Sequence, residues 1–261
     1  MKEMIDEIVK YRHLLYMLTW RDIKIKYKQS VMGFMWAIFM PMMIVAAGVL
    51  VRKAFSMLSG NPMDIKEVAS VSVKAIPWAF FVGSIRFATN SLTSNMNLVT
   101  KIYFPREVFP ISATMANLFD FAVASMILIV ILSFAQIGIS IYLLWVPVLI
   151  FLLILITIGT GMFLSCANLF FRDVKYIVEV ILTFGIFFTP VFYEAKMFGK
   201  WEPVLLLNPI GSILESINSV VVLHQAPSLY WVGYSAIWAL GGLLIAWNIF
   251  HKAEFTFAEN I

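Results

Sequence analysis

The chain has few charged residues, one cysteine and three histidines. Only 13% of its 261 residues are Asp, Glu, Lys or Arg, whereas soluble domains have about a quarter. A single cysteine, Cys166, excludes an intrachain disulfide. The histidines stand on different segments and no Cys/His group has metal-ligand spacing, so no metal site is expected. There is no G-x-x-x-x-G-K-[ST] loop, so nucleotide phosphates are not expected to bind in the P-loop manner.

Hydrophobic residues make up 61% of the chain, and the mean hydropathy is +0.89. This composition predicts an all-α integral membrane protein, because a crossing helix needs about 20 apolar residues. We expect six transmembrane helices, at residues 31–51, 76–99, 108–136, 141–171, 174–193 and 229–250. Residues 31–250 then form one transmembrane domain, between an N-terminal segment, 1–30, and a tail, 251–261.

Lysine and arginine are distributed unequally between the two sides of this topology. Twelve fall in the N-terminal segment, the second and fourth connections and the tail, and six fall in the other connections. The positive-inside rule therefore predicts that both termini are cytoplasmic. Nucleic acid is not expected as a partner.

Two amphipathic segments lie outside the expected spans. In the N-terminal segment, apolar residues recur at steps of three and four, which predicts a helix in the membrane interface; it could also cradle a cytoplasmic partner. Between the last two spans, apolar runs too short to cross are bounded by prolines. They predict two short re-entrant helices, at about 202–207 and 209–223.

Two charges interrupt the apolar segments. Arg86 and Asp120 stand at similar distances from the turn that joins their helices, so they are expected at one depth, as an ion pair. The pair would fix helix register or contact a substrate. The same second span carries a run of polar residues, including Asn90 and Ser94, which suggests a wetted or buried wall. The many aromatic residues suit an interfacial belt or, collectively, a sugar-stacking conduit.

Four motifs in order resemble one family. WRDIKIKYKQSVMGFMWAIFMP, KIYFPREVFP, NLFFRDVKYIVEVILTFGIFFTPVFY and LNPI are similar to segments of the ABC-2 type permeases that export O-antigen, teichoic acid and capsular polysaccharides. The resemblance implies a homodimer of six-helix subunits that binds two separate ATPase subunits. ATP and magnesium would then be bound by the partner, with no cofactor on this chain. The substrate would be a lipid-linked polysaccharide. The chain would lie in a bacterial inner membrane, in contact with membrane lipids.

The resemblance also gives the loop KIYFPREVFP a role. It implies a coupling helix, at about 97–106, that inserts into the ATPase, with rigid aromatic anchors and prolines to fix the exit. A tight loop with ordinary interfacial anchoring is the alternative. The residues expected to serve ATPase coupling, including the second cytoplasmic turn, are Asn97, Lys101, Ile102, Tyr103, Phe104, Pro105, Arg106, Glu107, Arg172 and Asp173.

The re-entrant helices resemble the family's periplasmic gate helices, and the first and fifth spans of two subunits would form the pathway. Candidate pathway and gate residues are Pro41, Trp78, Phe81, Asn90, Ser94, Pro190, Phe192, Tyr193, Asn208 and Pro209. The function expected is export of lipid-linked polysaccharide by a subunit that is not itself an enzyme. The alternatives are an ABC-2 exporter of a small lipid or drug, and a membrane transferase acting on lipid-linked sugar.

Overall fold

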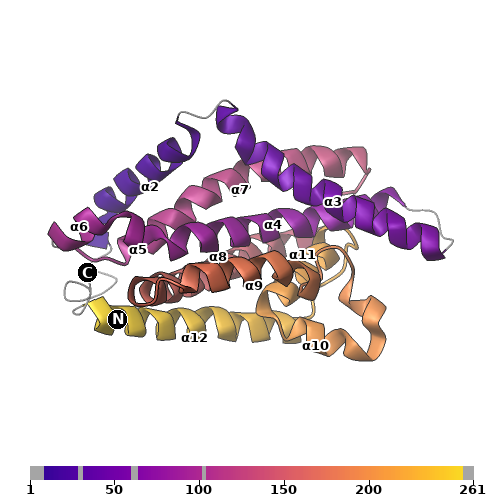
Figure 1. The fold of residues 1–261 in the computed structure, drawn as a ribbon. Coiled ribbons are helices and arrows are strands. Elements are labelled where there is room, and N and C mark those ends of the chain that lie inside the picture. Colours follow the sequence, from indigo (N-terminus) through magenta and orange to yellow (C-terminus); the bar gives the residue numbers. More distant parts are fainter. Residues whose placement is uncertain (1–8, 29–31, 60–63, 102–103, 255–261) are drawn as a thin grey trace.

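The computed structural model describes residues 9–28, 32–59, 64–101 and 104–254, without the side chains of Leu58, Ser59 and Lys101. Every regular element in these ranges is helical (Figure 1). In chain order they are α2 (Arg12–Tyr27), η1 (Gly33–Met35), α3 (Trp36–Ser59), α4 (Ile65–Thr89), α5 (Ser91–Ser94), α6 (Met96–Lys101), α7 (Val108–Phe134), η2 (Ile141–Trp145), α8 (Val146–Phe170), α9 (Val174–Phe188), η3 (Ala195–Trp201), α10 (Glu202–Leu206), α11 (Pro209–Val221) and α12 (Leu229–Glu254). The expected all-α class is confirmed for the described residues.

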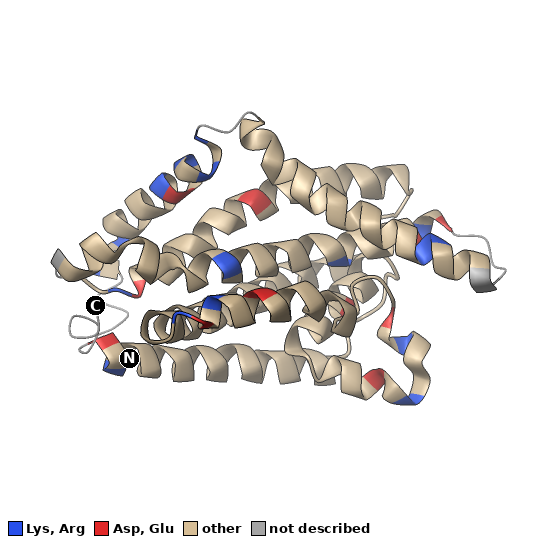
Figure 2. Ribbon diagram, viewed as in Figure 1, with Lys and Arg blue, Asp and Glu red and all other residues tan. Residues whose placement is uncertain are grey.

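Five helical segments are long and apolar enough to cross a membrane: Gly33–Met57, Ile65–Thr89, Val108–Phe134, Ile141–Phe170 and Leu229–Glu254. The chain is therefore a multi-pass membrane protein. Figure 2 shows that α8 and α12 carry no Lys, Arg, Asp or Glu along most of their length. Four of the five segments lie where the hydropathy of the sequence places them.

The second span begins earlier than the sequence predicts. The expected helix 76–99 was wrong in its bounds, because α4 runs from Ile65 to Thr89 and two short helices, α5 and α6, follow it. Hydropathy excluded the first turns of α4 because they contain Lys66, Glu67 and Lys74. Lys74 is nevertheless 1% exposed, and its charge is matched inside the protein.

The fifth expected span, 174–193, forms a helix of 15 residues that ends at Phe188. Such a helix is about 22 Å long, shorter than the roughly 30 Å hydrocarbon core. Thr189 takes an extended conformation, with φ −109° and ψ 135°, and Pro190 follows it. A residue before proline is disfavoured in the α region, which explains why α9 stops there.

The bundle has two ends. At the terminal end, the start of α2 and the last turns of α12 lie beside α5 and α6 (Figure 1). There Leu18, Val99, Phe104, Phe109 and Phe250 belong to one buried cluster. At the far end, η3, α10 and α11 fill the space between α9 and α12.

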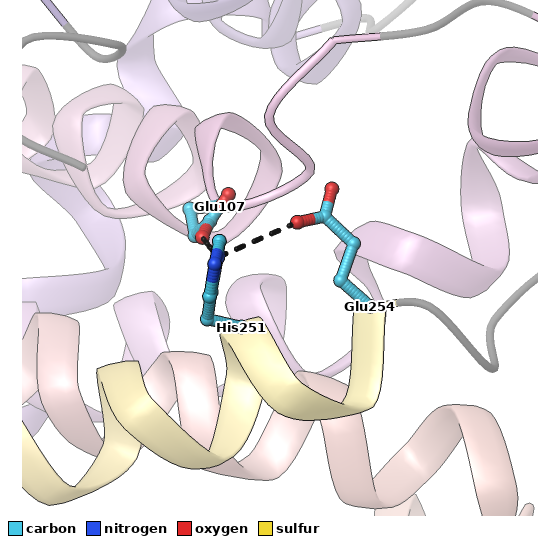
Figure 3. Close-up of side chains that lie close together, drawn as sticks. All are labelled: Glu107, His251 and Glu254. Atoms are coloured by element: carbon cyan, nitrogen blue, oxygen red, sulfur yellow. Dashed lines mark ion pairs between the residues drawn. The ribbon is translucent and has the colours of Figure 1, made fainter. Parts of the chain in front are cut away.

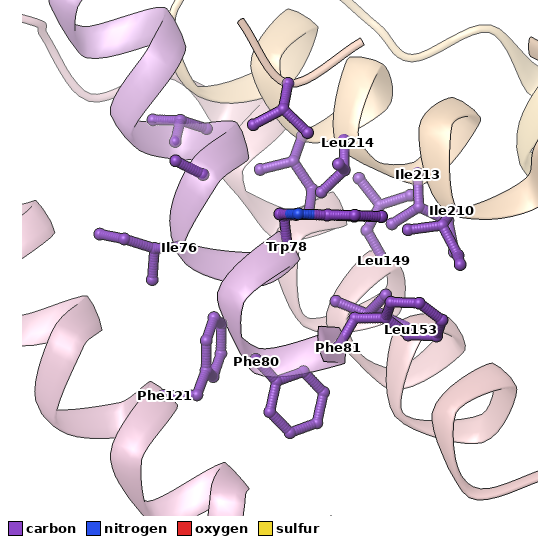
Figure 4. Close-up of a cluster of buried hydrophobic side chains, with 14 of the residues drawn as sticks. Ile76, Trp78, Phe80, Phe81, Phe121, Leu149, Leu153, Ile210, Ile213 and Leu214 are labelled. Atoms are coloured by element: carbon purple, nitrogen blue, oxygen red, sulfur yellow. The ribbon is translucent and has the colours of Figure 1, made fainter. Parts of the chain in front are cut away.

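The larger core lies between α4, α8 and α11. Trp78 of α4 is 4% exposed and lies between Leu149 and Leu153 of α8 and Ile213 of α11 (Figure 4). Burial of one such side chain stabilises the fold by about 2 kcal/mol. Next to this core, α8 and α12 approach closely, since a Cβ at Gly159 would lie 2.9 Å from the Leu243 Cα. Glycine is therefore needed at 159, because even the Cβ of alanine would meet the backbone of α12.

Candidate functional site

The described part of the loop KIYFPREVFP is hydrogen-bonded to the C-terminal end of α12. The Arg106 backbone N–H donates to Glu254 Oε1 at 3.1 Å, and Arg106 Nη1 donates to the Glu254 carbonyl at 2.6 Å. A second Arg106 nitrogen, Nη2, donates to the Val99 carbonyl of α6 at 3.2 Å. One guanidinium therefore joins the loop, the short helix before it and the C-terminal end of the last helix.

His251 lies between two carboxylates beside this junction (Figure 3). Its Nδ1 is 3.7 Å from Glu107 Oε1 and 3.9 Å from Glu254 Oε2. Ligand atoms of the three residues lie within 4.8 Å of one another, a spacing that would suit a small cation. Spacing along the sequence could not reveal this group, because Glu107 and His251 are 144 residues apart in the chain. The sequence-based expectation of no metal stays a prediction.

Three of the described coupling residues, Phe104, Pro105 and Glu107, are buried in their own chain. Phe104 is 6% exposed, with its ring centroid 5.4 Å from that of Phe109, and Glu107 is 3% exposed. Pro105 is buried and Arg106 half-buried. The expectation that Phe104 is a free anchor for a partner is therefore wrong, because its ring completes the core of the terminal end.

The other coupling candidates are exposed or lie outside the described residues. Asn97 on α6 is exposed, and so are Arg172 and Asp173 in the turn before α9. Ile102 and Tyr103 lie outside the described residues, as does the side chain of Lys101. The exposed residues of α6 and of the 171–173 turn are thus the described candidates that a partner could touch.

The two spans with interrupting charges do not pair with each other. Lys26 of α2 pairs with Asp120 at 2.9 Å, and the Tyr27 hydroxyl also donates to Asp120. Arg86 instead forms a bidentate ion pair with Glu179 of α9, at 2.8 and 2.6 Å. The expected Arg86–Asp120 pair is wrong, because Lys26 of α2 and Glu179 of α9 lie close enough to pair with these two charges instead.

Contacts of Lys26 bring the Lys26–Asp120 pair close to the Arg86–Glu179 pair. Lys26 Nζ also donates to Asn117 Oδ1 at 2.7 Å and lies 4.9 Å from the centroid of the Phe87 ring, next to Arg86 in the sequence. Burial and the hydrogen bond to Asp120 raise the pKa of the Tyr27 phenol, so Tyr27 stays protonated at neutral pH. We call Lys26, Arg86, Asp120 and Glu179 the charged layer.

Double-mutant cycles should separate the two pairings. For Lys26→Gln with Asp120→Asn we expect a coupling of about 1 kcal/mol, because the two side chains are in direct contact. For Arg86→Gln with Asp120→Asn we expect no coupling above about 0.5 kcal/mol. The measurement is the thermal stability of the detergent-purified single and double variants. A larger coupling for the Arg86 cycle would contradict the observed pairing.

At the far end, a buried lysine joins α4 to the segments around α11. Lys74 Nζ donates to the Tyr193 carbonyl at 2.5 Å and lies 3.6 Å from Glu215 Oε1. The same carboxylate oxygen accepts the Ala195 backbone N–H at 2.7 Å. Sequence reasoning missed this group because it assigned Lys74 to an external connection. The available signal was Glu215, the one acidic residue of the expected short helix 209–223.

The expected pathway residues divide into core and surface. Trp78 and Phe81 are buried, with ring centroids 5.7 Å apart, in the core of one chain and not on an open wall. Phe192 is also buried, and Pro41 lines a hollow described below. Helices α8 and α11 cover Trp78 (Figure 4), and Phe81 also lines a cavity together with Asn208 and Pro209. That these two rings line a transport pathway stays a prediction.

The remaining pathway and gate residues hold the backbone in place or face outward. Asn208 accepts the Ile210 N–H as the cap of α11, ahead of Pro209, and donates to Thr189 Oγ1 at 2.9 Å. The Pro190 ring packs at Gly211, and the Tyr193 hydroxyl donates to the Phe187 carbonyl. Asn90 donates to the Arg86 carbonyl, and Ser94 is exposed.

Comparison with known proteins finds relatives that match 94% to 100% of the chain. The family model of the ABC-2 type transporter matches residues 13–222. The chain is 27% identical over 271 residues to the O-antigen export system permease protein RfbA of Myxococcus xanthus, covering 100% of both chains. It is 28% identical over 256 residues to the protein of that name from Klebsiella pneumoniae, covering 94% of both. The chain belongs to the ABC-2 type transporter family.

Proposed function

We propose that this chain is the membrane subunit of an ATP-driven exporter of lipid-linked polysaccharide of the O-antigen type. The observation that carries the proposal is its similarity to O-antigen export permeases over 94% to 100% of both chains. ATP would be hydrolysed with magnesium by two separate subunits, each contacting one copy of a homodimer of this chain. The terminal end would face the cytoplasm of a bacterial cell, as the distribution of lysine and arginine predicts.

In this proposal a sixth crossing is made by α9 together with the non-helical segment after it. Thr189, Pro190, Val191 and Phe192 are buried, and Tyr193 reaches the level of Lys74. Irregular backbone is tolerated at membrane depth when protein surrounds it. Helix α11 starts beside Phe81, since Phe81, Asn208 and Pro209 line one cavity, and it runs back toward the far end. This arrangement supports re-entrant gate helices.

The short helix α6 and the turn before α9 would receive the ATPase. Both present exposed polar residues at the terminal end, whereas Arg106 and the buried loop residues connect that surface to α12. A movement of the ATPase would thereby be passed from α6 through α5 to α4, which precedes both in the chain, and through Arg106 to α12. The loop would link α6 to α12 within the chain. The exposed residues of α6 and of the 171–173 turn would form the surface that contacts the ATPase.

Charge reversal in the 171–173 turn tests this contact surface. In co-expression with candidate ATPase subunits, we expect Arg172→Glu with Asp173→Lys to reduce co-purification of the ATPase at least tenfold, because both side chains are exposed. The thermal stability of the chain should change by no more than about 0.5 kcal/mol. Lys200→Glu, exposed at the far end, is the control and should bind the ATPase normally.

Two outcomes would count against the proposal. If the native chain co-purifies with no ATPase, the exporter assignment fails. If the native chain binds an ATPase and the charge-reversed variant binds it equally well, the contact surface lies elsewhere while the assignment stands.

A further inference from the structure

A hollow of about 410 Å³ lies between α2, α3, α4 and α7. Its volume falls within the range of about 300–1,000 Å³ that is typical of ligand pockets. One part is apolar and lies between the helices α3, α4 and α7. The residues that line this part include Pro41, Ile44, Ile76, Phe80, Phe121 and Ala124.

The other part of the hollow is polar. It is lined by Lys26, Tyr27, Arg86, Asn117 and Asp120, which include three members of the charged layer. Asp120 is already engaged by Lys26 and Tyr27. With two cations and one carboxylate, this part has a formal charge of +1.

The charged layer marks one boundary of the hydrocarbon core. At the far end, Arg52 of α3 pairs with Glu67 of α4 at 3.1 Å. Glu67 and Arg86 are separated on α4 by a helical rise of about 28 Å, close to the roughly 30 Å thickness of that core. The start of η1 at Gly33 and Arg52 are separated by the same rise of about 28 Å. The polar part of the hollow therefore lies at the level of lipid headgroups, and its apolar part lies at the level of acyl chains.

Donors remain for an anion at this level. The Lys26 ammonium has three N–H groups and donates to Asp120 and Asn117. The ion pair with Glu179 uses Nε and Nη2 of Arg86 and does not use Nη1. Basic pockets between transmembrane helices on the cytoplasmic side bind phosphate-bearing lipid headgroups in membrane proteins.

We propose that the hollow binds a membrane amphiphile, with its phosphate at Lys26 and Arg86 and its hydrocarbon tail between α3, α4 and α7. Two cationic side chains with unused donors at the headgroup level and an apolar volume directly beyond them select this chemistry. The occupied site would fill the space between α3 and the rest of the bundle. The inference depends on insertion in a membrane and not on the polymer or the ATPase of the proposed function.

The test is lipid binding by the delipidated full chain in detergent, measured by native mass spectrometry. The probes are dioleoyl phosphatidylglycerol, a polyisoprenyl diphosphate and dioleoylglycerol, which lacks phosphate. Lys26→Gln with Asp120→Asn removes the ammonium donor, keeps hydrogen-bonding groups and leaves the formal charge of the polar part unchanged. It should weaken binding of the phosphate lipids about fivefold. Ala79→Phe places a ring in the hollow, which Ala79 lines, and should reduce binding of both tenfold or more. Lys24→Gln, exposed on the same helix, should bind like the native chain.

The two phosphate probes distinguish the source of the ligand. Tighter binding of phosphatidylglycerol identifies a membrane phospholipid, and tighter binding of the diphosphate identifies a lipid carrier. The proposal is overturned if dioleoylglycerol binds as tightly as both phosphate lipids, or if Ala79→Phe and the Lys26 variant both bind like the native chain. Because no ATPase enters this test, its failure leaves the proposed function untouched.

Discussion

Replacing Lys74 by methionine is expected to destabilise the folded chain by about 3 kcal/mol, because the substitution leaves a buried carboxylate without its cation. Lys74 is 1% exposed, and Glu215 is 18% exposed at its side chain. Glu215 would keep only the Ala195 N–H, and the Tyr193 carbonyl would lose its donor. The measurement is the midpoint of thermal aggregation of the chain purified in detergent.

Glu215 provides the matched rescue. In the double variant Lys74→Met with Glu215→Gln, the neutral amide still accepts the Ala195 N–H, so we expect most of the lost stability to return. Lys66→Met, an exposed position earlier on α4, should have no effect. Equal damage in the single and double variants would show that the charges of Lys74 and Glu215 are not coupled.

The same pair should matter for export. Lys74 joins α4 to Glu215 of α11 and to Tyr193 in the segment before α11. Helix α4 continues through α5 to α6 at the terminal end. A rescued double variant is therefore expected to fold but to export less, since α11 would no longer be held to α4 by charge. Export that matches the native chain would show that the pair serves stability alone.

Replacing Phe104 by alanine is the second change with a large expected effect. Phe104 is 6% exposed and belongs to the cluster of Val99, Phe109, Met162 and Phe250. Removing a buried phenylalanine side chain costs about 3–5 kcal/mol, so Phe104→Ala should lower the stability of the chain with no ATPase present. Phe104→Leu keeps much of the volume and should cost less than about 1.5 kcal/mol.

This result decides how the loop KIYFPREVFP is interpreted. If Phe104→Ala alone is as stable as the native chain, the ring is free and can serve as an anchor for the ATPase. If the expected loss occurs, reduced ATPase binding in that variant reports a disturbed core. Contacts with the partner are then better tested at the exposed Arg172 and Asp173.

The long apolar helices were predictable because each is specified by its own stretch of sequence. A crossing helix satisfies all its backbone hydrogen bonds within the segment, so length and hydropathy suffice to locate it. Helix α7 begins at the predicted residue, Val108, and α12 begins at Leu229. The short helices α10 and α11 were equally visible, since Pro203 and Pro209 lie in their first turns.

The bounds of α4 and α9 were not predictable in the same way. Hydropathy treats each charge as exposed, but Lys74 is matched by groups that are distant in the sequence. For α9, hydropathy counts apolar residues on both sides of Pro190 and takes no account of the conformation of Thr189. Composition cannot distinguish a continuous helix from a helix that is followed by a buried non-helical segment, as at residues 189–192.

The sequence by itself determined the class of the protein, its family, the level of most of its helices and the presence of charges within apolar segments. Each of these depends on neighbouring residues or on motifs read in order. Only the tertiary structure decided which charges pair, that Phe104 is buried, and that His251 lies between Glu107 and Glu254. These facts depend on which helices pack side by side, and the energy of an ion pair or a buried ring is set by its distance and surroundings in space and not by its spacing along the chain.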